Sequence, residues 1–280
     1  PEMENAELDQ RIRLAGLTAS IYLARMSLQT QPDETQTFAL SLEKVGFRRK
    51  SQLDRVVYIY MLQSQGLLRD TFFYGSSVRN LSPSLIHPNE IMDGAIVSGN
   101  YVIPSNRNST YFHLNNPIID ELYRRHNNDL LFGGVVICNE HSDLEAKERT
   151  TRETVDMLRR HGTEGVIITK EGGGNADTDL MLMGQACENQ GIQTVLIGNE
   201  SAGSDGADPA LAHFAKEATA FVTTGNNDEP VALEPVERLI GRGPLPGISG
   251  DMKKNLIVPV GRIYGAANLL GYNTLSTRVY

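Results

Sequence analysis

The feature of the sequence that most constrains the fold is a regular alternation of apolar and amphipathic segments between residues 130 and 224. Continuous apolar runs are typical of strands buried on both faces, and apolar residues at helical spacing are typical of helices that cover a sheet. The expected strands are Leu130–Asn139, Gly165–Thr169, Gln193–Gly198 and Ala220–Thr224, and the expected helices are Ser142–His161, Thr178–Gln190 and Pro209–Ala218. Because parallel neighbours need a crossover, which is normally a right-handed helix, the alternation predicts an α/β fold with a parallel, Rossmann-like sheet and helices on both faces.

The segments outside this alternation complete the expected architecture. A long amphipathic helix is predicted over Met3–Leu28, since apolar residues recur at roughly helical spacing and acidic residues crowd its start. Further expected elements are the strands Thr35–Leu42 and Val56–Leu62 and the helix Pro117–Asn127. The tail, Glu234–Tyr280, is rich in Gly and Pro and otherwise irregular; within it we expect a strand, Leu256–Val260, and a short helix, Ile263–Leu270. The length of 280 residues fits a single domain, 1–280, in which about 1–128 and 129–280 are candidate sub-lobes.

Five polar or glycine-rich segments directly follow apolar, strand-like runs. They are Gln63–Gly66, Ser98–Tyr101, Asn139–Ser142, Glu171–Asn175 and Glu200–Gly206. Ligands of parallel sheets bind beyond the carboxyl ends of the strands, so we expect these segments to line one cleft. The candidate substrate-binding residues of this cleft, and of the polar loop described next, are Gln63, Gln65, Glu90, Asn115, Asn116, Glu140, Glu171, Gly172, Gly173, Gly174 and Asn175.

A polar loop spans Asn89–Pro117. It is dense in Asn, Ser and Thr and has no helical or strand period, and long connections of this kind in compact domains are usually functional or disordered. The alternative is a solvated crossover on the surface. The loop carries His113, a candidate acid–base or ligand-orienting group, because the ordinary pKa of histidine lies near operating pH. We expect His113 to face the same cleft as Asn100 and Tyr101, the other candidate catalytic residues, unless it only bonds the neighbouring backbone.

Composition and charge exclude several functions. The net charge is −8 and Lys and Arg form no stripe, which argues against a nucleic-acid partner. No run approaches the roughly 18 apolar residues of a membrane span, and no apolar N-terminal segment resembles a signal peptide, so we expect a soluble, cytoplasmic protein without a membrane partner. Cys138 and Cys187 lie far apart in the sequence and give neither a disulfide framework nor a zinc-binding spacing.

Several histidines and acidic residues raise the alternative of a metal site. The candidate ligands are His87, Asp93 and His141, together with Glu90 and His113. Imidazole and carboxylate ligands together suit zinc or iron. Their spacing matches no metal-binding template, and the alternative is that most of them cap helices or lie on the surface.

A glycine-rich turn, Gly172–Asn175, lies between an expected strand and an expected helix. It resembles turns that cradle an anion at the N-terminus of a helix. It lacks the G-x-G-x-x-G pattern and the Lys-Ser/Thr pair of a P-loop. Asp177 and Asp179 follow it and would repel an anion. The sequence therefore favours either a tight strand-to-helix turn, with Asp177 or Thr178 as the N-cap, or a cationic or zwitterionic ligand.

A family resemblance is carried by four runs, Val57–Leu68, Glu90–Asn100, His113–Ile119 and Glu171–Asp179. They closely resemble the proprotein subunit of glycine/sarcosine/betaine reductase component B and, more distantly, the D-proline reductase proprotein, and the resemblance extends from about residue 14 to residue 280. It implies a proprotein that cleaves itself before a cysteine, which becomes a pyruvoyl group that captures the substrate amine. It also implies reductive C–N cleavage together with a partner subunit that bears a selenocysteine or cysteine.

The sequence departs from this family at the cleavage point. The family has Ser-Gly-Asn-Cys, whereas this chain has Ser98-Gly99-Asn100-Tyr101. Self-cleavage needs a heteroatom on the β-carbon of the residue after the scissile bond, and tyrosine has none, nor can its carbon skeleton yield pyruvate. We therefore expect a chain that stays intact between Asn100 and Tyr101 and carries no pyruvoyl group.

Three functions remain open. The leading hypothesis is a reductase-like enzyme subunit that acts on the C–N, C–S or related bond of a small amino-acid-like or polar nitrogen compound, in a hetero-oligomer with a thiol- or selenol-bearing partner subunit. The second is a metal-dependent enzyme in which a metal ion held by His87, Glu90, Asp93 and His113 replaces the lost carbonyl. The third is a non-catalytic structural subunit whose loop completes the active site of the partner.

Overall fold

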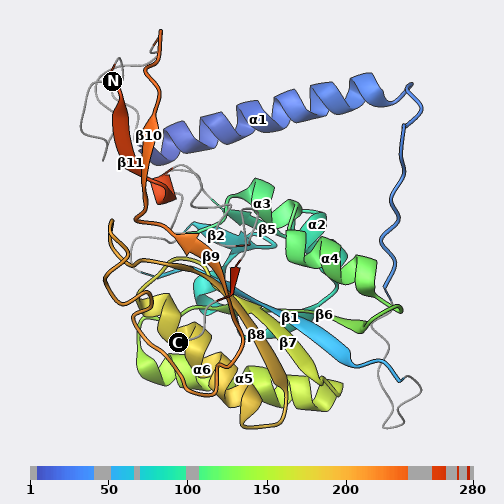
Figure 1. The fold of residues 1–280 in the computed structure, drawn as a ribbon. Helices are drawn as coiled ribbons and strands as arrows, with labels where there is room; N and C mark the ends of the chain where they lie inside the picture. Colours follow the sequence, from blue (N-terminus) through green and yellow to red (C-terminus); the bar gives the residue numbers. More distant parts are fainter. Residues whose placement is uncertain are drawn as a thin grey trace.

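A seven-stranded, mostly parallel sheet forms the centre of the protein (Figure 1). The structure, a computed structural model, describes residues 5–40, 52–65, 70–98, 107–238, 254–262, 270 and 276–277. The strand order is β12-β9-β8-β7-β1-β6-β4, in which only β4 and β12 are antiparallel to their neighbours. The strands are β1 (Arg55–Leu62), β4 (Ser84–Ile86), β6 (Leu131–Asn139), β7 (Gly165–Thr169), β8 (Gln193–Glu200), β9 (Phe221–Asn226) and β12 (Ser276–Thr277).

The remaining elements surround this sheet. A small antiparallel sheet has the order β3-β2-β5, and β10 pairs with β11. These strands are β2 (Thr71–Phe73), β3 (Ser76–Ser77), β5 (Ile96–Ser98), β10 (Pro230–Leu233) and β11 (Leu256–Pro259). The helices are α1 (Asn5–Ser27), α2 (Pro88–Met92), α3 (Thr110–Leu114), α4 (Pro117–Arg125), α5 (Leu144–His161), α6 (Asn175–Glu188) and the short 3₁₀ helix η1 (Val78–Asn80).

Alternate residues of β1 belong to two different hydrophobic clusters, because successive side chains of a strand point to opposite faces. The odd-numbered residues from Val57 to Met61 pack with side chains of α5 and α6. The even-numbered residues from Tyr58 to Leu62 pack with side chains of α2, α4 and β5 on the opposite face. Figure 1 shows the same layers, with α5 and α6 on one side of the sheet and α2, α3 and α4 on the other. The predicted α/β fold with helices on both faces is confirmed.

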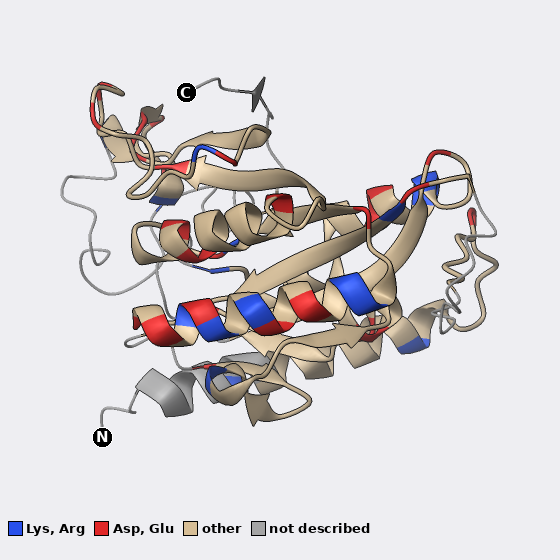
Figure 2. Ribbon diagram, turned by 90° about the horizontal axis from the view of Figure 1, so that it is seen from below, with Lys and Arg blue, Asp and Glu red and all other residues tan. Residues whose placement is uncertain are grey.

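The outer face of α5 carries acidic and basic residues in alternation, which Figure 2 shows along this helix. Glu148 and Arg152 form one of the ion pairs across a turn of the helix (3.8 Å). Such a mixture is typical of a solvated helix face rather than of a basic surface for nucleic acid.

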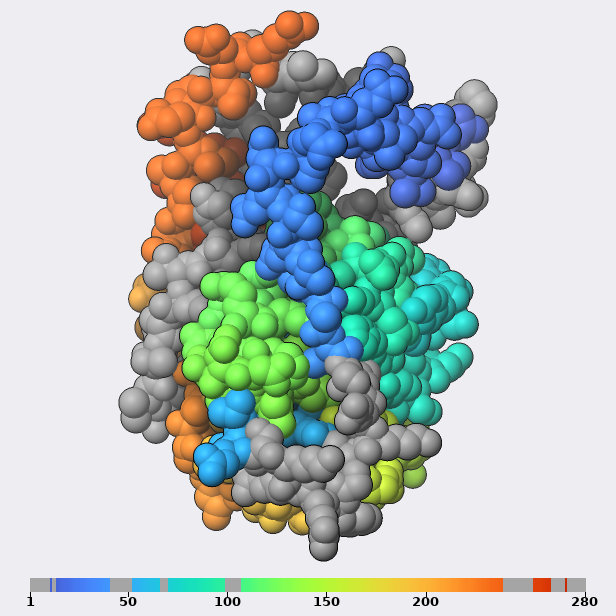
Figure 3. All heavy atoms as spheres, turned by 90° about the vertical axis from the view of Figure 1, so that its right-hand side faces the viewer, coloured from blue at the N-terminus to red at the C-terminus, as the bar shows by residue number. Residues whose placement is uncertain are grey.

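Two predicted elements are wrong. Residues 35–40 form no strand; they run extended over the surface of α2 and α4 (Figure 3), where the Asn89 side chain donates to the Phe38 carbonyl (3.2 Å). Residues 209–218 form an irregular segment with a bend and one turn instead of a helix. Their backbone groups bond to distant partners, since the Ala210 carbonyl accepts from the Ser201 N–H (3.0 Å) and the Ala212 N–H donates to Asp177 (2.9 Å). These tertiary bonds replace the bonds of the predicted helix.

The starts of two helices also differ from the prediction. The N-cap of α5 is Asp143, whose side chain accepts the Ala146 N–H (2.9 Å), and not Ser142. Helix α6 begins at Asn175, three residues earlier than predicted, because Gly174 takes the cap position with a φ of 69° that suits glycine. In the tail the predicted strand is confirmed as β11, whereas the predicted helix Ile263–Leu270 lies almost wholly outside the described residues.

Helix α1 lies apart from the main sheet, on the side where α2, α3 and α4 are found (Figure 1). Its large apolar side chains face outwards; Leu17 is 60% exposed and Leu23 is 66% exposed. Among the described residues, no helix has the length and apolar character needed to cross a membrane.

A candidate active site at the carboxyl edge of the sheet

Parallel strands bring polar residues to one edge of the main sheet. β1, β6, β7 and β8 pair in parallel, so their carboxyl ends lie side by side. The segments that follow them also touch. The Ser64 hydroxyl donates to Asn139 Oδ1, and the Asn175 side chain donates to Gln65 Oε1 (2.5 Å). The structure thus brings together the segments after β1, β6 and β7, as the polar strand ends predict.

Glu171 follows β7 and is fully buried. Its Oε2 accepts the backbone N–H of Gln63 (2.7 Å), and its Oε1 accepts the backbone N–H of Asn108 (2.8 Å). Its own N–H donates to Glu140 Oε1 (2.8 Å). Burial raises the pKa of Glu171 to about 7, although the two N–H bonds and the charge of Arg107 oppose the rise. Near neutral pH this carboxyl is divided between its charged and neutral forms.

Glu140 follows β6 and is a second fully buried acid. Burial, followed by the charge of Asp179, raises its pKa well above the usual value, and Lys170 opposes the rise. Its Oε2 has no hydrogen-bond partner among the described residues. Burial also raises the pKa of Asp179 to about 6, against the effect of Lys147 beside it. The raised pKa makes Glu140 a candidate for proton exchange with a ligand.

Two buried lysines fix the glycine-rich turn. Lys170 Nζ donates to the Gly172 carbonyl (2.6 Å) and to Asn199 Oδ1 (3.2 Å), and it pairs with Asp177 Oδ1 (2.8 Å). Lys147 pairs with Asp179 and also donates to the carbonyl of the first residue of α6 (3.2 Å). The ion pairs of these lysines with Asp177 and Asp179 therefore fix the turn to the start of α6, as expected for a tight strand-to-helix turn.

Acids outnumber bases among the buried charged residues that the structure describes at this edge. The acids are Glu140, Glu171, Asp177, Asp179 and Glu200, and the bases are Arg107, Lys147 and Lys170. Arg107 is already paired, through two contacts, with Asp70. Excess buried negative charge is relieved either by protonation or by a cation. The edge therefore suits a cationic or zwitterionic ligand better than an anionic one.

His113 lies on α3, fully buried, with both ring nitrogens engaged. Nδ1 lies 2.6 Å from the Tyr60 hydroxyl and Nε2 lies 2.8 Å from Ser98 Oγ. Asn108 Nδ2 donates to the Tyr60 hydroxyl (3.0 Å). We assign the tautomer from this network: Tyr60 donates its proton to Nδ1, and Nε2–H donates to Ser98. Because Ser98 accepts from the ring, His113 does not activate it as a nucleophile.

The charge state of His113 follows from its surroundings. Burial, and then the nearby charge of Arg107, lowers its pKa to about 3. The ring is thus neutral between pH 6 and 9, an arrangement that suits an orienting group. Its predicted acid–base role stays a prediction. So does its relation to Asn100 and Tyr101, which lie outside the described residues.

Five other predicted site residues lie at the ends of short helices. His87 is the N-cap of α2, its Nδ1 accepting an N–H of the first turn (3.1 Å), and Glu90 completes the capping box by accepting the His87 N–H (2.9 Å). Asp93 is the C-cap of the same helix. Asn115 is the C-cap of α3, and Asn116 is the N-cap of α4. The substrate- and metal-binding roles of these residues stay predictions.

The candidate metal ligands do not form one group. Within the described ranges, no three or more His, Cys, Asp or Glu side chains are arranged to hold a metal ion. His87 Nε2 donates to the Leu40 carbonyl (3.0 Å), and His141 Nε2 bonds Thr150 Oγ1 (2.8 Å). Their ring nitrogens are thus used in separate local contacts.

Sequence reasoning did not single out Arg107, Asn108 and Lys170. All three are buried, and each is recognisable only through a distant partner, such as Asp70 for Arg107. The available signals were weak. Lys170 directly follows the predicted strand Gly165–Thr169, and the other two lie within the polar loop.

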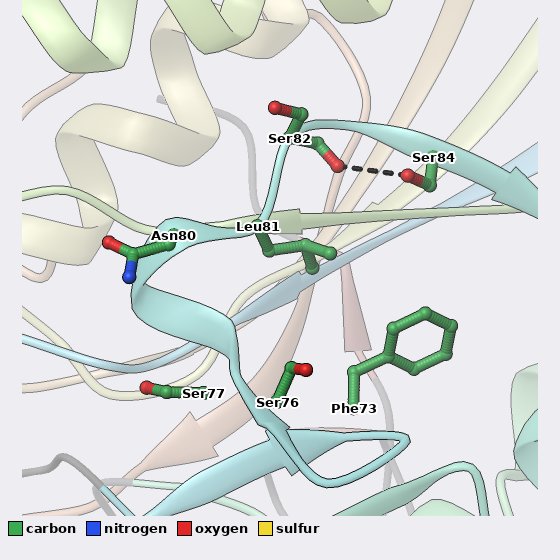
Figure 4. A pocket seen from close by; sticks show the side chains of 7 residues that line it. All are labelled: Phe73, Ser76, Ser77, Asn80, Leu81, Ser82 and Ser84. Atoms are coloured by element: carbon green, nitrogen blue, oxygen red, sulfur yellow. Dashed lines mark hydrogen bonds between the residues drawn. The ribbon is translucent and has the colours of Figure 1, made fainter.

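A separate hollow of about 460 Å³ lies beside the small antiparallel sheet (Figure 4). Its lining is formed by Phe73, Ser76, Ser77, Asn80, Leu81, Ser82 and Ser84. The lining carries no charge, and none of the site residues predicted from the sequence belongs to it.

The sequence of this chain is similar to those of known proteins. The sequence profile of the glycine/sarcosine/betaine reductase component B subunits matches residues 1–278. The glycine reductase complex component B subunits alpha and beta of Peptoclostridium acidaminophilum are 36% identical over 99% of this chain and 67% of their own length. The corresponding protein of Acetoanaerobium sticklandii is 37% identical over 96% of this chain and 65% of its own length. The sarcosine reductase complex component B subunit alpha of Peptoclostridium acidaminophilum is 38% identical over 85% of this chain and 56% of its length.

No solved structure matches this chain. The chain spans about two-thirds of the length of the two glycine reductase proteins that it matches. The profile covers nearly all of the chain, including the four runs that carry the resemblance and the strand ends that form the buried edge. The chain belongs to the family of glycine/sarcosine/betaine reductase component B subunits.

Proposed function

We propose that this chain is a reductase-type subunit that binds a small amino-acid-like or other polar nitrogen compound at the carboxyl edge of its sheet and works without a pyruvoyl group of its own. The observation that carries the proposal is the buried excess of acids at this edge, in a chain of the component B family. The cationic nitrogen of a bound ligand would relieve that excess. Glycine, sarcosine and betaine, after which the relatives are named, all carry such a nitrogen.

Polar atoms at the edge suit the two ends of such a ligand. Glu140 Oε2 and Asn108 Oδ1 are buried acceptors with no hydrogen-bond partner among the described residues. Acceptors of this kind suit an ammonium group. Gln65 Nε2 is a buried donor that likewise lacks a partner there, and a donor suits a carboxylate oxygen. The three atoms together favour a zwitterion.

The reductant is proposed to come from a partner subunit. Both cysteines of the chain are buried, and burial raises the pKa of Cys138 and raises that of Cys187 to about 12. Neither is therefore a reactive thiolate near neutral pH. In our proposal a thiol- or selenol-bearing subunit supplies both the two electrons and the protons that reductive cleavage of the C–N or related bond requires.

The absence of a pyruvoyl group is proposed from the sequence. Tyr101 stands where the resemblance places a cysteine, and its β-carbon carries an aromatic ring instead of a heteroatom. The chain therefore lacks, at the β-carbon of residue 101, the oxygen or sulfur atom to which the acyl group would shift before elimination produces a ketone. The ligand would be held by non-covalent contacts instead of a Schiff base.

A second candidate function is a non-catalytic subunit that completes the site of its partner. The closed hydrogen-bond network of the neutral His113 favours it, since a buried neutral ring orients other groups without exchanging protons. Turnover of the assembled complex carrying His113→Gln separates this function from the first.

Ligand binding tests the leading proposal. Isothermal titration of the full chain with glycine, sarcosine and betaine is expected to detect binding of at least one of them, and Glu140→Gln is expected to weaken it about tenfold or more. Because burial raises the pKa of Glu140 and its charged form is the one that binds a cation, the affinity of the unaltered chain should rise as the pH rises.

The matched control is Glu145→Gln, the same change at an exposed position on α5, which should bind like the unaltered chain. Failure of all three compounds to bind would contradict the proposed ligand class. Equal affinity of the Glu140→Gln and Glu145→Gln chains would contradict the role of the edge.

A further inference from the structure

Two contacts, one buried and one partly buried, join the chain that leaves β1 to the chain that leads into α3. The first is the carboxylate of Glu171, which accepts the N–H of Gln63 on one oxygen and the N–H of Asn108 on the other. The second is the ion pair between Arg107 and Asp70, in which Nη2 lies 2.5 Å from Oδ2 and Nη1 contacts Oδ1. Gln63 is thus linked to Asn108 through Glu171, and Asp70 is linked directly to Arg107.

We propose that Glu171 is a positioning residue, a clamp whose two carboxylate oxygens hold the backbone of Gln63 close to the backbone of Asn108 at the carboxyl edge of the sheet. The Asp70–Arg107 ion pair joins the same two segments a second time. Both carboxylate oxygens are already engaged by backbone donors. Glu171 thus shapes the edge through these two segments and leaves contact with a ligand to its neighbours. This role goes beyond the proposed function and does not depend on it.

A carboxylate is the side chain that fits this position. Two N–H donors converge from different segments, and a carboxylate offers each of them an oxygen, whereas an amide offers one oxygen and an NH₂ that faces the second donor. Hydrogen bonds to an ionised acceptor are also shorter and stronger than those to a neutral one. A glutamine at this place would therefore leave one N–H without an acceptor.

The clamp extends into the network around His113. Asn108, which Glu171 holds by its backbone, donates from its side chain to the Tyr60 hydroxyl (3.0 Å), and Tyr60 in turn bonds His113. His113 then bonds Ser98, the last residue of β5. All five residues are buried. A continuous chain of contacts therefore links the end of β7 to the end of β5.

The strength of the clamp depends on the charge of Glu171. The charged and titratable groups that face it are Arg107, from the segment before α3, and Glu140, from the end of β6. Arg107 favours the charged form and is itself paired with Asp70, while burial raises the pKa of Glu140. Because burial raises the pKa of Glu171 to about 7, the carboxyl becomes mostly charged as the pH rises to 8, and opening the clamp, which exposes this carboxyl to water, becomes easier as it ionises.

Hydrogen exchange of single backbone amides tests the clamp on the full chain. At pH 8 the amides of Gln63 and Asn108 should exchange about tenfold faster, or more, in Glu171→Gln than in the unaltered chain, which corresponds to about 1.4 kcal/mol. The amide of Ile59, inside β1, should not change. Glu145→Gln, the same substitution on the exposed face of α5, should leave all three amides as they are.

A pH series on the unaltered chain provides a test that does not depend on the variant folding. After correction for intrinsic exchange, protection of the Gln63 and Asn108 amides should fall from pH 6 to pH 8, and in Glu171→Gln it should stay level. Equal protection in both chains, or protection in the unaltered chain that does not change with pH, would overturn the proposal. Because no ligand is added, the outcome is independent of whether the proposed ligands bind.

Discussion

Protonation decides what each carboxyl at the sheet edge can do. Burial raises the pKa of Glu140, Glu171 and Asp179, so the folded protein binds protons at these groups that the unfolded chain has already lost. For Glu171 the window runs from the ordinary value near 4.5 to about 7, and its contribution to the free energy of unfolding falls as the pH rises through that window. Above pH 7 the edge is therefore least stable alone and gains most from a cationic ligand.

The role of His113 is tested by replacing it with glutamine in the assembled complex. Since its ring is neutral far above its pKa of about 3, we expect the pH profile of turnover between pH 6 and 9 to keep its shape. Glutamine cannot reach both Tyr60 and Ser98, so the free energy of unfolding should fall by about 1–3 kcal/mol, the usual cost of one buried polar group left unpaired. Denaturant unfolding and pH–rate profiles measure the two effects.

The matched control is His213→Gln, at an exposed histidine, which should change the free energy of unfolding by less than about 0.5 kcal/mol. If His113→Gln instead removes a limb of the pH–rate profile that His213→Gln retains, His113 exchanges protons during turnover, and the orienting role assigned to it is wrong.

At the scale of secondary structure, the long buried strands could be predicted from the sequence. β6, β7 and β8 are continuous apolar runs in both the sequence and the sheet, and their predicted bounds differ from the observed ones by at most two residues. The strands β2 to β5 have two or three residues each, too few for a period to be recognised. They exist because distant segments pair with them, as Thr71 pairs with Ser98.

The candidate site divides in the same way. Residues that directly follow long strands, such as Glu140 and Glu171, could be predicted, because topology alone places strand ends together. Arg107 and Lys170 could not, since their importance comes from ion pairs with Asp70 and with Asp177, and these pairings follow no helical or strand period that the sequence would show.

Helix α1 is expected to lie in an interface of the assembled complex. Leu14, Leu17 and Ile21 form part of one face, and each is more than half exposed in the isolated chain. Leu17→Glu combined with Ile21→Glu should abolish association with the proposed thiol- or selenol-bearing subunit, as measured by light scattering of the mixed proteins. The circular dichroism of the chain alone should not change.

The control for this interface adds the same charges elsewhere on α1, as Ser20→Glu combined with Ser27→Glu. The hydroxyls of these serines bond only to backbone carbonyls of the helix itself, so association should persist. If the Leu17/Ile21 variant associates with the subunit as well as the unaltered chain does, this assignment of α1 is wrong. It is also wrong if light scattering shows that the unaltered chain uses this face only to bind a second copy of itself.

At the scale of the whole molecule, one sheet carries strands from both sides of residue 128. β1 lies between β6 and β7, and so the N-terminal part of the chain is inserted into the C-terminal alternation. The buried edge depends on this insertion, because Gln63 comes from the N-terminal part and Glu140 and Glu171 come from the C-terminal part. The acid-rich edge is thus built from both parts of a chain that has tyrosine at residue 101.

The central claim is that this component B chain works without a pyruvoyl group, and intact-mass spectrometry before and after treatment with a hydrazine reagent tests it most directly. We expect one species with the mass of the uncleaved chain, unchanged by the reagent, because Tyr101 lacks the heteroatom that self-cleavage requires. Two fragments that meet between Asn100 and Tyr101, or a hydrazone adduct on either of them, would contradict the account.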